Sequence, residues 1–133
     1  RQKLLEHQTS FTFETVMSHP SKIETLKAAN DKDYRTYLYY IATEHPSINI
    51  SRIQYRVLQG GHSVPDDKVR SRYHKSLELL IDAVKETNRA YIFDNSGDSQ
   101  EKTWLAEITD GKTVEIKTDE VPVWFQRYFL DRI

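Results

Sequence analysis

The pattern of apolar and polar residues predicts alternating strands and helices along this 133-residue chain. Strands are predicted where apolar residues alternate with polar ones or run together, at residues 10–15, 34–42, 90–93, 104–108 and 114–116. The run from Tyr37 to Ala42 is almost continuously apolar. This predicts a strand buried on both faces, as in a parallel sheet.

Helices are predicted over residues 20–30 and 121–133, and on both sides of Gly60-Gly61. Asp110-Gly111 is a hairpin signal between the last two strands. The order predicts a single α/β domain, residues 1–133, with a mainly parallel sheet flanked by helices, a helical lid at about residues 48–76 and a C-terminal hairpin. Ligands are expected at the carboxyl ends of the strands, where the loops 14–18, 43–46 and 94–97 follow.

Residues 48–77, INISRIQYRVLQGGHSVPDDKVRSRYHKSL, concentrate cationic side chains around a double glycine. Arg52 and Arg56 are four residues apart and share one helix face. Gly60-Gly61 can end that helix, and Arg72 belongs to the next one. Arginines on both sides of a glycine turn suit a lid over phosphate, because the guanidinium group offers planar, bidentate donors. A pair of solvated helices with surface charges is the alternative that the charge pattern leaves open.

The composition of the chain excludes several classes of protein and of functional site. The chain is 38% hydrophobic and 29% charged, which indicates a globular domain. Its net charge of −1 argues against a general nucleic-acid or membrane-surface binder. The chain has no cysteine, so disulfides and thiolate sites are excluded, and no histidine pair has metal-site spacing. No apolar run reaches the roughly 20 residues of a membrane span, and we expect a cytoplasmic protein without a metal site of its own.

The lid segment also carries a family resemblance. Its arginine pair, GGH-x-VP, RY and serine-leucine resemble the lid of zeta-toxin-like kinases, a P-loop family that includes many predicted small ATPases. The resemblance covers about residues 10–116 and lies C-terminal to the phosphate-binding segment of the family. It implies phosphorylation of a small molecule that depends on ATP and Mg²⁺. The typical acceptor in the family is a nucleotide sugar such as UDP-N-acetylglucosamine.

The resemblance also implies roles for individual residues. The arginines of the lid would contact phosphate and the transition state, and the loop after the first strand would bind the acceptor. These residues are Arg52, Arg56 and Arg72 for catalysis, and Glu14, Thr15 and Ser18 for the acceptor. From their positions, we expect His62 in the turn and Asn95 after a core strand to bind the cofactor. From the residues alone, a strand-end cap for Glu14 and turn hydrogen bonds for His62 and Asn95 remain open alternatives.

The chain does not contain the phosphate-binding motif G-x-x-x-x-G-K-[ST]. Its nearest match ends at Gly111-Lys112-Thr113, but Ala106 stands at the first glycine position and a strand is predicted to follow, so we interpret it as a hairpin turn. The chain starts at Arg1, and its single methionine is Met17, so we expect a fragment, a processed piece or an incompletely recorded sequence. It is expected to be inactive alone, and its expected protein partner is an upstream P-loop segment or an antitoxin-like protein. The alternative is a non-catalytic nucleotide- or partner-binding module that keeps the kinase-like shell.

Overall fold

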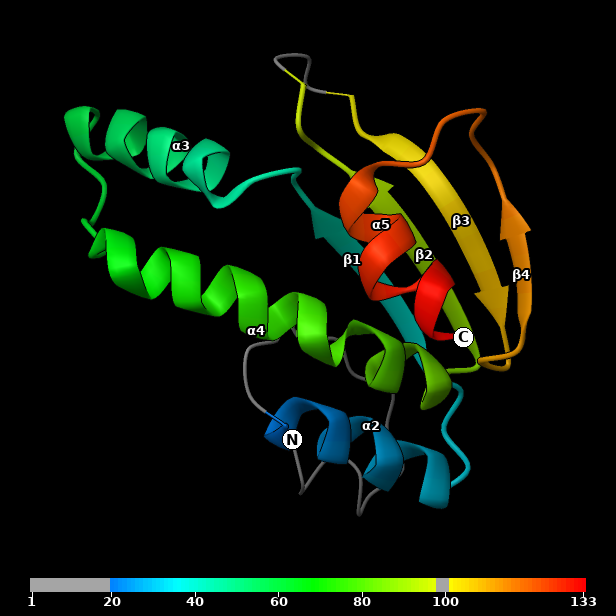
Figure 1. Cartoon of the computed structure of the whole chain (residues 1–133). Coiled ribbons are helices and arrows are strands. Elements are labelled where there is room, and N and C mark those ends of the chain that lie inside the picture. The colour runs from blue at the N-terminus through cyan, green and yellow to red at the C-terminus, as the bar shows by residue number, and fades with distance from the viewer. Residues whose placement is uncertain (1–19, 98–100) are drawn as a thin grey trace.

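The computed structural model describes residues 20–97 and 101–133. The strand predicted at residues 10–15 and the predicted acceptor residues Glu14, Thr15 and Ser18 lie outside the described residues. Figure 1 shows the arrangement of the elements. In chain order they are α2 (Ser21–Asp31), β1 (Tyr37–Ala42), α3 (Pro46–Leu58), α4 (Asp66–Lys85), β2 (Arg89–Asp94), β3 (Thr103–Thr109), β4 (Thr113–Ile116), α5 (Val123–Tyr128) and the 3-10 helix η1 (Leu130–Arg132).

The four described strands form one sheet in the order β1-β2-β3-β4. The pair β1-β2 is parallel, whereas β2-β3 and β3-β4 are antiparallel. The predicted α/β fold is confirmed, but the described sheet is mixed where a mainly parallel one was predicted. Among the described strands, parallel pairing is confined to β1 and β2, which α3 and α4 connect.

The C-terminal hairpin is confirmed at the predicted position. Asp110 and Gly111 both have positive φ, at 54° and 67°, and the N–H of Lys112 donates to the carbonyl oxygen of Thr109 at 3.1 Å. A Cβ atom on Gly111 would lie 2.8 Å from the Cα of Lys85, so the turn needs glycine for space as well as for conformation. The Gly111-Lys112-Thr113 sequence is therefore a strand connection, as expected.

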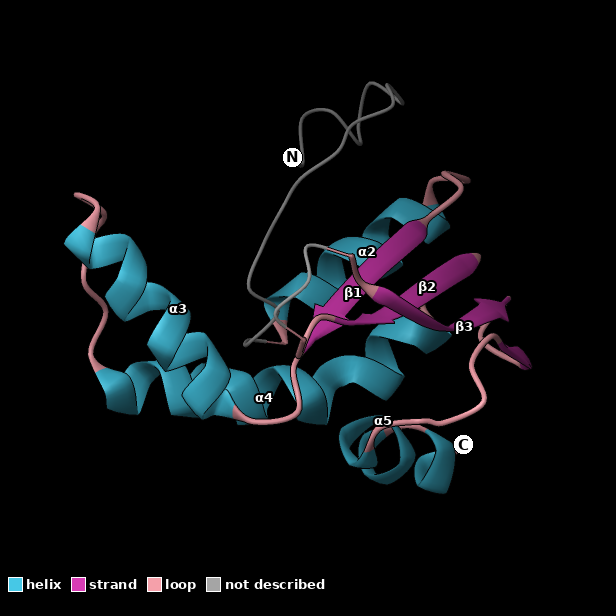
Figure 2. Ribbon diagram, turned by 90° about the horizontal axis from the view of Figure 1, so that it is seen from above, coloured by secondary structure: helices cyan, strands magenta, loops and turns pink. Residues whose placement is uncertain are grey.

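The helices α4 and α5 lie on one side of the sheet (Figure 2), and α2 packs beside α4. Together they bury an apolar core with the inward side chains of the strands. Its fully buried large side chains are Leu77, Leu80, Val84, Ile92, Leu105, Ile108, Phe125 and Phe129. The C-terminal helical segment is shorter than predicted, because α5 ends at Tyr128 and η1 follows it.

The prediction that the strand 37–42 is buried on both faces is wrong. Tyr40 is buried against the helices, whereas Tyr37 and Tyr39 are 52% and 66% exposed. Side chains alternate between the two faces of a strand, and the described helices cover only one face of this sheet. Tyrosine tolerates such a position, because its ring packs on its neighbours while its hydroxyl group remains in water. Tyr39 accordingly stacks on Tyr91 with ring centroids 4.8 Å apart.

The predicted lid is an antiparallel hairpin of α3 and the first half of α4, which projects from the sheet (Figure 1). Gly60 has a φ of +94° where α3 ends, and its N–H donates to the carbonyl oxygen of Val57 at 3.0 Å. The N–H of Gly61 donates to the carbonyl oxygen of Arg56 at 2.8 Å. These two bonds form a Schellman motif, which confirms the predicted helix end. A Cβ atom on Gly61 would lie 2.9 Å from that oxygen, so both glycines are required.

Candidate functional site

A hollow of about 1080 Å³ lies along β1. All six residues of β1 line it, together with residues of α2, α3, α4 and the turn between the lid helices, whereas no residue of β2, β3 or β4 does. The hollow therefore follows the edge of β1 that faces away from β2. We call it the β1 hollow.

The described lining of the β1 hollow is positively charged. It includes four cations and one histidine, and no aspartate or glutamate belongs to the described lining residues. The cations are Lys22, Arg35, Arg56 and Arg72, and the histidine is His62. A concave site lined by charges of one sign concentrates ligands of the opposite sign. The site thus suits an anion, and arginine suits phosphate oxygens in particular.

The lid hairpin brings three of the predicted site residues to this hollow. Arg56 lies in the last turn of α3, His62 lies in the turn, and Arg72 lies in α4. Arg72 shares a helix face with Ser76, whose Oγ lies 2.8 Å from the hydroxyl oxygen of Tyr40. Since that contact joins α4 to β1, it also directs Arg72 into the hollow. The role of each of these residues in catalysis or cofactor binding stays a prediction.

The structure separates Arg52 from Arg56. Nη2 of Arg52 donates to the carbonyl oxygen of Gly97 at 3.0 Å, and Arg52 does not belong to the described lining of the hollow. The bond ties the first half of α3 to the turn after β2. A spacing of four residues could not distinguish the two arginines, because the contact that separates them comes from a distant part of the chain. The predicted catalytic role of Arg52 remains untested.

The loops after β1 and β2 meet, as the sequence predicted for the carboxyl ends of parallel strands. The N–H of Asn95 donates to the carbonyl oxygen of Ala42 at 2.9 Å, and the N–H of Glu44 donates to Oγ of Ser96 at 2.8 Å. Asp94 accepts hydrogen bonds from the N–H of Ser96 and from Nε1 of Trp124, at 2.8 and 2.7 Å. Asn95 does not belong to the described lining of the hollow, so its predicted contact with a cofactor stays a prediction.

Two tyrosines of the hollow were not predicted as site residues, although Tyr73 belongs to the RY pair of the lid segment. Besides the Tyr40–Ser76 contact, the hydroxyl group of Tyr73 donates to the carbonyl oxygen of Thr43 at 2.6 Å. Burial raises the pKa of Tyr40 well above its ordinary value, and burial with nearby negative charge raises the pKa of Tyr73 to about 12. Both phenols are therefore neutral at physiological pH and serve as hydrogen-bonding groups that hold α4 to β1. The sequence contained one indication of this role, because a tyrosine at a core position, unlike a phenylalanine, carries a hydroxyl group that needs a hydrogen-bond partner.

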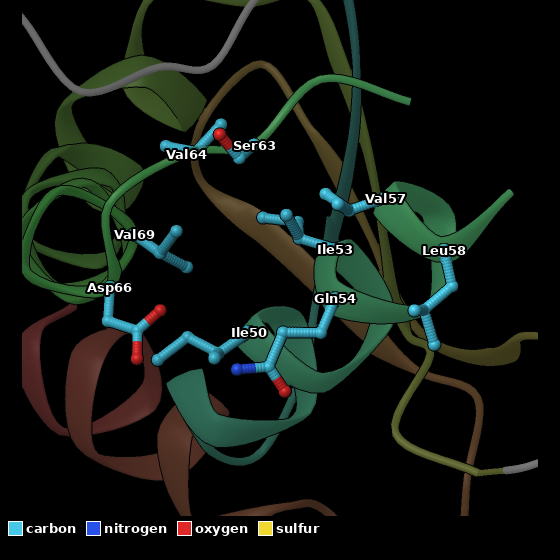
Figure 3. Close-up of a pocket in the computed structure, with 9 residues that line it drawn as sticks. All are labelled: Ile50, Ile53, Gln54, Val57, Leu58, Ser63, Val64, Asp66 and Val69. Carbon is cyan, nitrogen blue, oxygen red and sulfur yellow. The ribbon is translucent and has the colours of Figure 1, made fainter. Parts of the chain in front are cut away.

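A second, smaller cavity of about 380 Å³ lies between the two lid helices. Figure 3 shows Ile50, Ile53 and Val57 of α3 facing it, with Val69 of α4 on the other side. The lining is mainly apolar, with Gln54, Ser63 and Asp66 as its polar members. This cavity lacks the cations of the β1 hollow and leaves the outer part of the lid loosely packed.

The described part of the chain fits phosphate better than it fits a metal ion. Within residues 20–97 and 101–133, no group of three or more His, Cys, Asp or Glu residues could hold a metal. Magnesium prefers carboxylate and phosphate oxygens, and the described lining of the hollow offers no carboxylate. The arginines of the lining suit phosphate oxygens. Among the described helices, none has the length and apolar character of a membrane span.

The comparisons with known proteins agree with the lid resemblance. A model of the zeta toxin family matches residues 1–105. A curated protein of Haemophilus influenzae, described as an uncharacterized protein, is 33% identical over 69 residues, which are 52% of this chain. The chain spans about half the length of that relative, 49%. No solved structure matches the chain. Because the family match covers most of the sequence, this chain belongs to the zeta toxin family, whose fold is that of kinase-like P-loop NTPases.

Proposed function

We propose that this chain is the lid-bearing, C-terminal portion of a cytoplasmic ATP-dependent kinase that phosphorylates a small molecule. The proposed acceptor is a nucleotide sugar such as UDP-N-acetylglucosamine, bound in the β1 hollow. The observation that carries the proposal is the described lining of the hollow, with four cations and no carboxylate. Family membership supports phosphoryl transfer and the use of ATP and Mg²⁺ in general.

In this proposal, the residues of the chain bind and orient phosphate groups. The guanidinium groups of Arg56 and Arg72 donate to phosphate oxygens from the two sides of the lid, and His62 donates from the turn. The loop 14–18 presents the acceptor hydroxyl group through Glu14, Thr15 and Ser18. Closure of the lid excludes water from the site. ATP supplies the phosphoryl group that is transferred.

The phosphate-binding loop and the carboxylates for magnesium have to come from elsewhere. The 133 residues contain no G-x-x-x-x-G-K-[ST] motif, and the described lining of the hollow contains no carboxylate. We therefore propose that an upstream or partner segment supplies these groups. Activity of the chain alone is not expected.

The test compares two cations of α4 that differ in position. Arg72 lines the hollow, whereas Lys75 is exposed and does not belong to its described lining. We expect Arg72→Ala to weaken binding of UDP-N-acetylglucosamine about tenfold or more, because a hydrogen bond to a charged group contributes about 1.5–3 kcal/mol. Lys75→Ala should leave the affinity within about twofold. Isothermal titration calorimetry measures both, and equal effects would remove the proposed site.

A second candidate is a non-catalytic module that binds nucleotide or a partner protein. The absence of the phosphate-binding motif from the sequence favours it. One assay distinguishes the two candidate functions. It measures the transfer of ³²P from ATP to UDP-N-acetylglucosamine after a segment that carries the phosphate-binding motif is added. Transfer that Arg72→Ala reduces far more than Lys75→Ala does supports the kinase. Binding of the sugar nucleotide without transfer supports the module.

A further inference from the structure

Asn49 is a polar residue of the β1 hollow to which the proposed function gives no role. It lies near the start of α3 and shares one helix face with Ile53 and Arg56, because the three residues are four and three positions apart. All three line the hollow. The face of α3 that brings Arg56 to the hollow therefore brings a neutral amide group to it as well.

The buried residue Thr43 fixes the orientation of this amide. Oγ1 of Thr43 donates to Oδ1 of Asn49 at 2.6 Å. This distance is typical of a hydrogen bond between two oxygens and is shorter than a bond to a nitrogen usually is. The other acceptor near Oγ1, the carbonyl oxygen of His45, lies 3.2 Å away and already accepts from the N–H of Ile48 at 3.1 Å. The oxygen of the amide is therefore the atom that faces Thr43.

With its oxygen bound to Thr43, the amide of Asn49 has its nitrogen available for a ligand. Among the hydrogen bonds of the described residues, the side chain of Asn49 takes part only through Oδ1. Nδ2 carries two N–H donors, and the residue is partly buried in the wall of the hollow. A donor that is withdrawn from water gains most from an acceptor that the ligand itself supplies. Asn49 is thus oriented to bind an oxygen of a molecule in the hollow.

Arg72 reaches the hollow beside the same threonine. The hydroxyl group of Tyr73, the next residue, donates to the carbonyl oxygen of Thr43 at 2.6 Å, and both Arg72 and Tyr73 line the hollow. Thr43 thus holds α3 through its side chain and α4 through its backbone. Asn49 and Arg72 therefore flank one end of the hollow from the two helices of the lid. Since the described lining contains no carboxylate, none competes there with an anionic ligand.

We propose that Asn49 is a further phosphate-binding residue of the hollow and that Thr43 positions it. Nδ2 of Asn49 donates to an oxygen of the phosphate group that Arg72 binds, so that one phosphate receives a neutral donor from α3 and a charged donor from α4. The hydroxyl group of Thr43 holds the amide with its nitrogen toward the phosphate. This inference deepens the proposed function and rests on its placement of phosphate in the hollow.

Two substitutions that each turn an amide of α3 into a carboxylate test the contact. Asn49→Asp places a negative charge beside the phosphate, whereas Gln54→Glu adds the same charge at an exposed residue of the smaller cavity between the lid helices (Figure 3). Isothermal titration calorimetry of the full chain with inorganic pyrophosphate, without Mg²⁺, measures both variants. We expect the dissociation constant to rise more than about tenfold in Asn49→Asp and less than about twofold in Gln54→Glu. Asn49→Ala, which adds no charge, should raise it about three- to tenfold.

The positioning role of Thr43 has a separate test. Thr43→Val keeps the branched shape of the side chain but removes the hydroxyl group, and it should raise the dissociation constant for pyrophosphate about three- to tenfold. Thr43→Ser keeps the hydroxyl group and should restore the affinity to within about twofold of the natural chain. In a chain that already carries Asn49→Ala, Thr43→Val should cause no further loss, because Thr43 acts through Asn49. A merely structural role would cause the same loss with and without Asn49→Ala.

Each outcome decides the proposal. A large loss of pyrophosphate affinity in Asn49→Asp, with Gln54→Glu close to the natural chain, supports the contact. Equal losses in these two variants, an unchanged affinity in Asn49→Asp, or no pyrophosphate binding by the natural chain overturns it. Failure of Thr43→Ser to restore the affinity overturns the positioning role. Pyrophosphate binding that depends on Asn49, without any binding of UDP-N-acetylglucosamine, would leave this inference standing and refute the proposed acceptor.

Discussion

The two halves of α4 belong to different parts of the molecule. From Leu77 to Val84, five side chains face the core, and Leu80, Ala83 and Val84 are completely buried. From Asp66 to Ser76, Val69 is the only buried residue, and the helix instead carries Arg72 toward the β1 hollow. One continuous helix therefore joins a packed core to a lid that makes few apolar contacts. The difference teaches that the apolar packing of α4 is concentrated in its core half, whereas its lid half carries the arginine on which the proposed ligand binding depends.

The largest expected effect comes from the core. Leu80→Ala removes a fully buried side chain from the core half of α4 and should lower the free energy of unfolding by about 2–5 kcal/mol. Leu58→Ala, at the end of α3 in the lid, is the matched control because Leu58 is 85% exposed. It should change stability by no more than about 0.5 kcal/mol. Urea denaturation measures both, and comparable losses would refute the contrast between core and lid.

The second-largest loss of stability is expected in the turn between the two lid helices. Gly60 adopts a φ of +94°, so Gly60→Ala forces a side chain into a left-handed conformation and should cost about 1–2 kcal/mol. Gly60→Asn should cost less, because asparagine tolerates this conformation better than alanine. Thermal unfolding compares the two variants. An equal loss for alanine and asparagine would show that the left-handed conformation is not what the turn requires.

A somewhat smaller effect is expected where the two halves of α4 meet. Tyr40→Phe removes the hydroxyl group that contacts Ser76 and should lower the free energy of unfolding by about 1 kcal/mol. Ser76→Ala should do the same, and the double variant should cost less than the sum of the two. Full additivity in this cycle would mean that the contact does not couple β1 to α4.

The smallest effect comes from an exposed ion pair at the other side of α4. Arg132 donates to both carboxylate oxygens of Glu78, at 2.8 and 3.3 Å, and this hydrogen bonding lowers the pKa of Glu78. A lowered pKa contributes stability above the pKa of the unfolded chain, and the contribution is lost as the pH falls through the folded value. Glu78→Gln should therefore lower the urea midpoint slightly at neutral pH, and the difference from the natural chain should shrink as the pH falls through the folded pKa of Glu78. A difference in the urea midpoint that keeps the same size as the pH falls would assign the effect to packing.

Local signals in the sequence predicted the local features well. Asp110-Gly111 predicted the hairpin turn, and Gly60-Gly61 predicted the end of the first lid helix, because each needs a conformation that few residues adopt. The strand at Tyr37–Ala42 was found within three residues of its start. Its burial was not, since a run of tyrosines looks apolar in sequence although two of the rings remain in water.

Features set by distant contacts could not be predicted in the same way. The antiparallel direction of β3 relative to β2 depends on how the chain returns to the sheet, which no local pattern specifies. The separation of Arg52 from Arg56 depends on Gly97, 45 residues away from Arg52. Arg56, His62 and Arg72 were all predicted from the lid segment, and the lid hairpin does bring all three to one hollow.

The most direct test measures stability and binding on one preparation of Arg72→Ala. The account predicts that the free energy of unfolding stays within about 0.5 kcal/mol of the natural chain, because Arg72 is exposed in the lid. The dissociation constant for UDP-N-acetylglucosamine should rise about tenfold or more in the same sample. A loss of stability that accompanies the loss of binding, or an unchanged dissociation constant, would contradict the assignment of ligand chemistry to the lid.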